Sequence, residues 1–266
     1  VNRDWYYVTK KKREKFKGSV KEYSQDFMTT FDKRMVIDEG FKRAFSELIL
    51  LIVNSTDQKK IEKIQLNQIK GMIESFSIEQ ETFIDETYYV KLGVSFNKKK
   101  VFNFLEQNNI FPSTPIKKRF LFVPIIIDEN KKDLSLFSNN RIYTRWDDYS
   151  ENFHLIEYIL PTEDLEDLNL LRNNYEIIEQ YEFKEIISKY DLEDSIIALI
   201  FKNNKNLRVL SRISIKENVI LKNQSFSNSD LENQDSVKNI INSLKILYED
   251  YWKDYNQINT SIRLVL

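Results

Sequence analysis

"RFLFVPIIID" runs from Arg119 to Asp128, and every residue from Phe120 to Ile127 is apolar. A strand with one solvated face would alternate apolar and polar residues, and this stretch does not. Such a run is typical of a central strand that is covered on both faces, as in sheets that carry helices on each side. The sequence therefore predicts an α/β domain with this stretch inside its sheet.

The chain around this stretch supplies further elements for the same domain. "DSIIALIFKN" (Asp194–Asn203) predicts a second buried strand, and "LRVLSRISI" with "VILKNQSF" predicts a hairpin around "KEN". The other expected elements are a strand or loop at Asn140–Tyr149, a strand at Phe153–Leu160, and helices at Leu165–Arg172, Glu182–Tyr190 and Asp235–Tyr255. Together they predict a C-terminal α/β domain with a mixed sheet over residues 119–258.

The first half of the chain predicts a small α+β domain over residues 35–113. In "MVIDEGFKRAFSELILLIVNST" (Met35–Thr56) the apolar residues recur at three- and four-residue steps, which indicates a helix. "TYYVKLGVSF" (Thr87–Phe96) alternates and indicates a half-buried strand, paired with the preceding "SIEQETF". The remaining expected features are a helix at Leu66–Phe76, a helix capped by Asn97, and a linker at "FPSTP" (Phe111–Pro115).

Composition excludes several classes of protein. The chain has no Cys, which excludes disulfides, zinc–thiolate sites, iron–sulfur clusters and thiol nucleophiles. Its 4 Gly are scattered, so neither common phosphate-binding motif is present. The formal net charge of -1 favours neither nucleic acid nor an anionic membrane as a partner. No apolar run reaches the length of a transmembrane helix.

The sequence also supports predictions about the two ends of the chain. Residues 1–34 are expected to form a basic N-terminal arm, because they contain "KKKREKFK". Residues 259–266 alternate like a strand with nothing after them, so we expect them to begin a further, missing segment. Because the chain opens at Val1 without Met, removal of a signal peptide is expected.

"YILPTEDLEDLNLL" (Tyr158–Leu171) places four acids within five residues directly after a strand, which raises the possibility of a metal or acid/base site. The start of a helix is the better explanation, because acids in a first turn complement the helix dipole. Thr162 or Asp164 would be the N-cap, and with Asp164 as the cap, Asp167 would be the acid of a capping box. Leu165, Leu168 and Leu171 are expected to share the buried face. We favour the helix start.

Three groups of residues are candidates for function, although no catalytic motif is present. "DDYSENFH" brings Asp147, Asp148, Glu151 and His154 within eight residues, a loose match to a divalent metal site and to a metal-dependent hydrolase. Lys10, Lys11, Lys12 and Arg13 belong either to a solvated arm or to a surface for phosphate, anionic lipid headgroups or nucleic acid. Trp146 lies in the polar stretch "YTRWDDY" and could contribute to an interface.

Several stretches resemble DUF2066, a family of uncharacterised exported proteobacterial proteins. They are "IDEGFKRAFSELILLIVNST", "YYVKLGVSFNKKKVFNFLEQNNI", "KKRFLFVPIII" and "ILPTEDLEDLNLL", and the resemblance spans residues 35–255. It implies export to the periplasm or cell envelope and a protein partner, such as an inner-membrane permease. It implies no catalytic residue and no small-molecule cofactor. The leading expectation is therefore a non-enzymatic envelope protein that binds another protein or serves as a scaffold.

Overall fold

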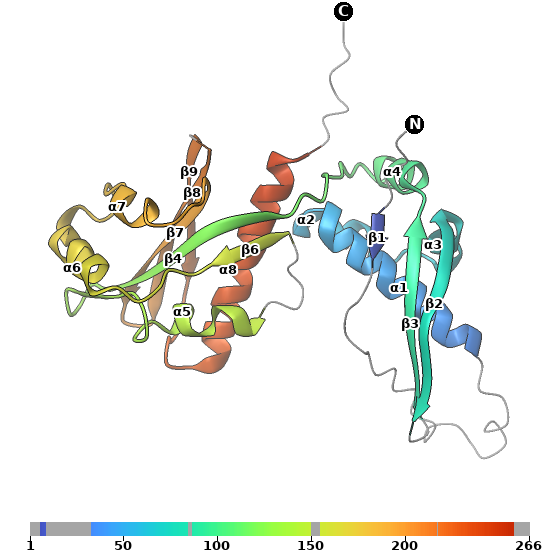
Figure 1. Cartoon of the computed structure of the whole chain (residues 1–266), viewed down its shortest axis with the longest axis horizontal. Coiled ribbons are helices and arrows are strands. Elements are labelled where there is room, and N and C mark those ends of the chain that lie inside the picture. Colours follow the sequence, from blue (N-terminus) through green and yellow to red (C-terminus); the bar gives the residue numbers. More distant parts are fainter. Residues whose placement is uncertain (1–5, 9–32, 85–86, 150–154, 217, 258–266) are drawn as a thin grey trace, which may run out of the picture. The chain divides into compact units, whose positions relative to one another are not determined.

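The computed structural model describes residues 6–8, 33–84, 87–149, 155–216 and 218–257 (Figure 1). The chain forms two compact units, one of Val1–Pro115 with Lys253–Leu266, and one of Ile116–Trp252. The division falls at the end of the "FPSTP" segment. The second unit ends at Trp252, whereas the sequence predicted a C-terminal domain that continues to residue 258. The residues after Trp252 belong to the first unit.

The second unit is built on a mixed sheet of six strands with β4 (Lys118–Asp128) in its interior. On one side β4 pairs in parallel with β7 (Ser195–Asn203), which is followed by β8 (Asn206–Ile215) and β9 (Asn218–Phe226), both antiparallel. On its other side β4 pairs with β6 (Ile156–Ile159) in parallel and with β5 (Asp133–Ser135) antiparallel. The predicted fold class, helices with a mixed sheet, is confirmed.

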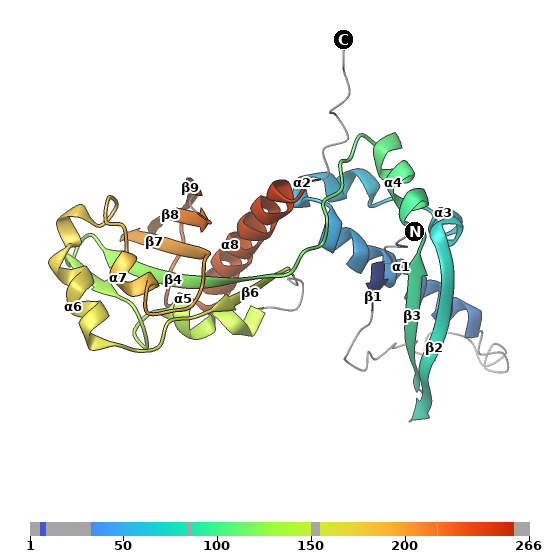
Figure 2. The ribbon, with the colours of Figure 1, turned by 45° about the horizontal axis from the view of Figure 1, so that its top comes forward.

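Helices cover both faces of this sheet, which explains the unbroken apolar run in β4. Leu121 and the alternate residues after it pack with α6 (Leu165–Asn173), η5 (Tyr175–Ile177) and α7 (Lys184–Ile187). Phe120 and Phe122 point to the opposite face, where they contact Trp252 and Tyr248 of α8 (Gln234–Tyr255). Figure 2 shows α6 and α7 well apart from α8.

The stretch Asn140–Tyr149 is helical, which corrects the expectation of a strand or loop. It forms α5 (Arg141–Arg145) and η4 (Trp146–Tyr149). The Asn140 side-chain oxygen accepts hydrogen bonds from the N–H groups of Ile142 and Tyr143, at 2.9 and 3.0 Å. Its amide nitrogen donates to the carbonyls of Pro124 and Ser135, so contacts with β4 and β5 fix the start of this helix.

The first unit packs helices against a three-stranded antiparallel sheet. Its strands are β1 (Tyr6–Val8), β3 (Thr87–Phe96) and β2 (Ile73–Ile84), in that order. Its helices are α1 (Lys33–Ile52), α2 (Ser55–Gln58), η3 (Lys59–Ile61), α3 (Leu66–Met72) and α4 (Lys98–Gln107). A Cβ on Gly40 would lie 2.4 Å from Leu92 Cδ1, so this glycine allows α1 to lie close to β3.

The helix expected at Leu66–Phe76 ends at Met72, where β2 begins. Pairing with β3 decides the conformation from Ile73 onward, and Phe76, expected to point inward on a helix, is 49% exposed. The expected cap of α4 is confirmed, because Asn97 Oδ1 accepts from Lys100 N at 3.1 Å. None of the helices in the described residues is long and apolar enough to cross a membrane.

Candidate functional site

The expected metal ligands are only partly placed by the structure. Asp147 and Asp148 lie in η4 with exposed side chains, and Asp148 forms an ion pair with Arg145 at 3.0 Å. Glu151 and His154 lie outside the described residues, as do Lys10–Arg13 of the basic arm. In the part of the chain that is described, no three His, Asp or Glu side chains come together to hold a metal ion. The metal site and the nucleic-acid surface both stay predictions.

Trp146 is not a surface residue, which corrects the expectation of an interface role. Its side chain is fully buried, with its ring stacked on Phe122 at 3.9 Å between centroids. Tyr158 and Tyr248 lie beside it, at 5.1 and 6.4 Å. A side chain enclosed in this way cannot contact a partner, so Trp146 belongs to the core between the sheet and α8.

Buried polar side chains of α8 bind the main chain around this aromatic core. Lys245 is 1% exposed, and its Nζ donates to the carbonyls of Trp146 and Tyr149 at 2.8 and 3.2 Å. One turn later, Glu249 Oε1 accepts from the N–H groups of Leu155 and Ile156 at 2.9 and 3.1 Å. The two side chains thus supply partners for the end of η4 and the beginning of β6.

Burial sets the ionisation of this cluster. It lowers the pKa of Lys245 to about 8, although the negative charges of Asp147 and Glu249 act in the opposite direction. Burial also raises the pKa of Tyr158 and of Tyr248. Tyr248 shares a 2.8 Å hydrogen bond with Ser211 of β8. The polar side chains of Lys245 and Glu249 are used in hydrogen bonds to main-chain groups. We therefore interpret this cluster as part of the folded core and not as a catalytic site.

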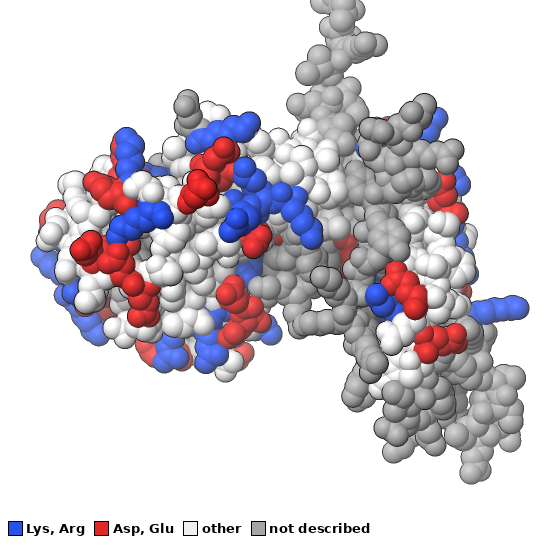
Figure 3. All heavy atoms as spheres, viewed as in Figure 1, with Lys and Arg blue, Asp and Glu red and all other residues white. Residues whose placement is uncertain are grey.

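A cleft of about 980 Å³ lies beside this cluster in the second unit. Its lining contains Lys117–Arg119, Asp147, Leu155–Tyr158, Asp191–Glu193 and Lys245. Its charges are largely matched: Lys118 Nζ lies 2.8 Å from Asp194 Oδ2, and Arg119 lies 3.7 Å from Glu157. Figure 3 likewise shows basic and acidic side chains interspersed over this unit. The cleft therefore has no marked preference for a ligand of either charge.

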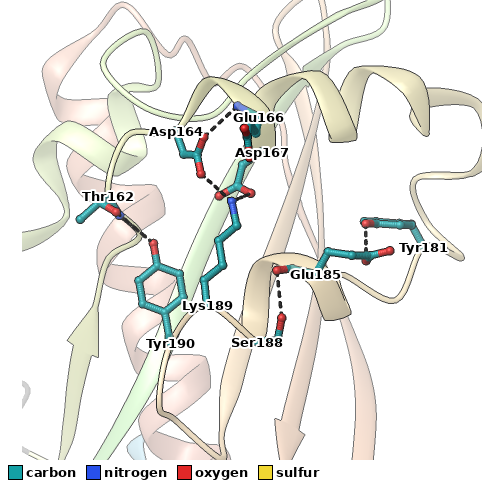
Figure 4. A network of polar contacts seen from close by, with 9 residues as sticks. All are labelled: Thr162, Asp164, Glu166, Asp167, Tyr181, Glu185, Ser188, Lys189 and Tyr190. Atoms are coloured by element: carbon teal, nitrogen blue, oxygen red, sulfur yellow. Dashed lines mark hydrogen bonds and ion pairs between the residues drawn. The ribbon is translucent and has the colours of Figure 1, made fainter.

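The acid-rich junction between β6 and α6 is a helix start held by a lysine (Figure 4). Asp164 is the N-cap, and its Oδ1 accepts from Glu166 N at 2.8 Å. Lys189 Nζ lies 2.5 Å from Asp164 Oδ2 and 2.6 Å from Oδ1 of the buried Asp167. The hydrogen bond from Lys189 lowers the pKa of Asp164. These contacts account for Asp164 and Asp167 without a metal.

Two details of the junction differ from expectation. Asp167 makes its bond with Lys189, whereas the sequence suggested a capping-box contact to the N-cap. Leu165 is 76% exposed, whereas Leu171 is buried as expected. Lys189 lies 22 residues after Asp167, so the sequence around Asp167 does not predict this ion pair.

The outer edge of the mixed sheet is the feature best suited to bind another molecule. β9 pairs with β8 in unbroken register over all nine of its residues, from Asn218 to Phe226. Its other edge has no partner strand among the described residues. Two of its apolar side chains, Val219 and Leu221, are each 55% exposed.

Other described sheet edges carry the protections that natural proteins use against unwanted pairing. At the opposite side of the mixed sheet, β5 and β6 are only 3 and 4 residues long. In the first unit, β2 has two register shifts and carries Glu74, Glu79 and Glu81. β9 has an unbroken register, contains no proline, and has Lys222 as its one charged residue.

The hairpin register fixes which main-chain groups of β9 point outward. Two residues separate Ile215 from Asn218, so these two form the closing hydrogen-bonded pair. Hydrogen-bonded pairs then recur at every second residue, and the even-numbered residues of β9 bond to β8. The odd-numbered residues, which include Val219 and Leu221, direct their N–H and C=O groups to the free edge. Val219 and Leu221 thus combine exposed apolar side chains with main-chain N–H and C=O groups that point to the outer edge of the sheet.

The sequence predicts β9 as a hairpin strand but does not indicate a binding site there. The consecutive apolar residues Val219, Ile220 and Leu221 were the available signal, because in a strand they must lie on both faces.

Comparisons with known proteins add no family: no family model matches the chain, and neither the curated proteins nor the solved structures contain a match.

Proposed function

We propose that this protein is a non-enzymatic protein-binding module that captures an extended segment of a partner at the free edge of β9. The observation that carries the proposal is the nine-residue outer edge of β9, which has no partner strand among the described residues and exposes Val219 and Leu221. Addition of a strand to such an edge is a common mode of peptide recognition, in which main-chain hydrogen bonds supply affinity and alternate side chains supply specificity.

The proposed compartment is the periplasm or cell envelope. It is supported by the resemblance of residues 35–255 to the DUF2066 family, and the same resemblance supports an inner-membrane permease as the partner. Fractionation of cells of the source organism tests the compartment: recovery with the periplasmic or envelope fraction supports it, and recovery with the cytosol contradicts it.

Site-specific photocrosslinking in those cells tests the binding edge. A photoreactive phenylalanine analogue replaces Leu221 in one variant and Leu165 in a matched control. Leu165 is an exposed leucine of the same unit, at 76% exposure, but lies on α6. The proposal expects a discrete crosslinked product from position 221 and none from position 165.

A second variant separates the main-chain contribution from the side chain. In Leu221→Pro the lost N–H points to the free edge, so the ladder with β8 keeps its hydrogen bonds. Capture of the crosslinked partner, measured from position 219, should fall strongly in this variant while the thermal unfolding temperature stays close to that of the parent. Crosslinking that is equal at positions 221 and 165, or unaffected by proline, would contradict the proposal.

A further inference from the structure

We infer that the segment bound at β9 alternates apolar and acidic residues, and that it belongs to a different protein. This inference rests on the proposed function and specifies its ligand. It follows from the two faces of β9, from the charges along the strand, and from the register that two copies of β9 would adopt.

One face of β9 selects apolar residues. Lys222 Nζ lies 5.9 Å from the Tyr251 ring of α8, so the even-numbered side chains point toward α8. Val219 and Leu221 therefore lie on the opposite face, because successive side chains of a strand alternate. A strand that pairs with the free edge places alternate side chains directly beside these two. Apolar residues at those positions would bury the exposed surface of both.

The other face selects an acid. Lys222 is the one charged residue of β9 and is exposed in the middle of the strand. Lys205, in the turn between β7 and β8, adds an exposed positive charge near the Phe226 end. At the Asn218 end, Lys216 is adjacent to Glu217, so that turn is formally neutral. An acidic residue opposite Lys222 forms a favourable cross-strand pair.

A second copy of this chain fits the edge less well. If two copies of β9 paired antiparallel over their full length, the symmetry axis would pass through Lys222. The two Lys222 side chains would then be directly opposite, and like charges in that arrangement are unfavourable. Val219 would lie beside Ser225 of the other copy, so the apolar side chains would not meet. A shift of register that brings Val219 beside Leu221 leaves only five residues of each strand paired.

Synthetic peptides test this inference on the full chain. The first probe is a nine-residue peptide that alternates valine and glutamate, acetylated and amidated, and its twin has lysine in place of glutamate. A third probe is the glutamate peptide with alternate amides N-methylated, which blocks strand pairing. Affinities are measured by fluorescence anisotropy for the wild type and for Lys222→Glu, with circular dichroism as a check on folding.

The expected result is a dissociation constant about threefold to tenfold lower for the glutamate peptide than for the lysine peptide, with the order reversed in Lys222→Glu. The N-methylated probe should not bind.

The remaining outcomes separate the inference from the proposed function. Equal affinity for the glutamate and lysine peptides would overturn the inference and leave strand addition intact. Absence of binding by both unmethylated peptides would overturn the inference and the proposed function together. A dimer in light scattering that becomes a monomer in Leu221→Lys, with no peptide bound, would overturn it in favour of a second copy.

Discussion

Lys245 is a buried lysine whose amino group forms hydrogen bonds with main-chain carbonyls. Its Nζ binds two carbonyls at the end of η4 and lies 4.9 Å from the Trp146 ring centroid. Removal of an ammonium group from water is costly, which is why the pKa of Lys245 falls to about 8. A neutral amine still has N–H groups to donate to these carbonyls. The contact therefore survives deprotonation.

This arrangement predicts an unusual dependence of stability on pH. In the unfolded chain Lys245 keeps its proton up to a pKa of about 10.5, whereas the folded protein releases it near about 8. Between these values the unfolded state binds more protons, so the contribution of Lys245 to the free energy of unfolding rises with pH, by at most about 1.4 kcal/mol per unit. Below about pH 8 the contribution is flat.

Urea unfolding of wild type and Lys245→Met at several pH values from about 7 to 9.5 measures the effect, because tyrosine ionisation intrudes above that range. The difference in unfolding free energy between the two proteins should be constant up to about pH 8 and should then increase in favour of the wild type. Lys238→Met, at an exposed position of the same helix, should follow the wild type. Parallel profiles for wild type and Lys245→Met would show that the pKa of Lys245 is not lowered.

At the scale of elements, the junction of β6 and α6 depends on contacts of very different burial. Asp167 is 1% exposed, whereas Asp164 is at the surface and acts mainly as the N-cap. Asp167→Asn removes a charge-assisted bond inside the protein and should lower the free energy of unfolding by about 1–3 kcal/mol. Asp164→Asn keeps a side chain that caps helices well, so its cost should be much smaller.

Chemical denaturation of the two variants at neutral pH compares them directly. A cost for Asp164→Asn equal to that of Asp167→Asn would mean that the surface ion pair with Lys189, and not the buried carboxylate, holds the junction.

The elements that could be predicted are those whose pattern is repeated many times. Helix α8, strand β4 and the two strands of the β8–β9 hairpin each extend over nine or more residues. The local pattern does not predict the conformation where contacts with other elements decide it. Asn140 starts α5 by bonding to Pro124 and Ser135, and Phe76 lies in a strand because β3 is available to pair.

The candidate site follows the same rule. The sequence of β9 predicts a hairpin strand, but only the sheet order shows that no described strand lies beyond it. Lys245 and Glu249 are typical of an exposed ion pair when they are considered along α8 alone. Their burial becomes evident only with η4 and β6 in place, because their partners there are 93 to 99 residues away in the sequence.

At the scale of the molecule, residues from the end of the chain complete the first unit. Lys253 is buried, and its Nζ donates to the Val53 carbonyl at 3.1 Å, just after the last residue of α1. Ser113 pairs with Gln257 in an isolated β-bridge, and Thr114 N donates to Asn256 O at 3.1 Å. The first unit is therefore assembled from both ends of the sequence.

This closure predicts that Lys253→Met destabilises the first unit selectively. The variant removes a buried cation from the C-terminal end of α1, where the helix dipole favours positive charge, and should cost about 1–3 kcal/mol. Hydrogen exchange should become faster in the last turns of α1 and remain unchanged in β4 and β7, which belong to the second unit. Lys238→Met again provides the control, since its side chain is exposed on α8. Equal acceleration in β7 would mean that the two units unfold as one, and the closing contacts would then stabilise the whole chain.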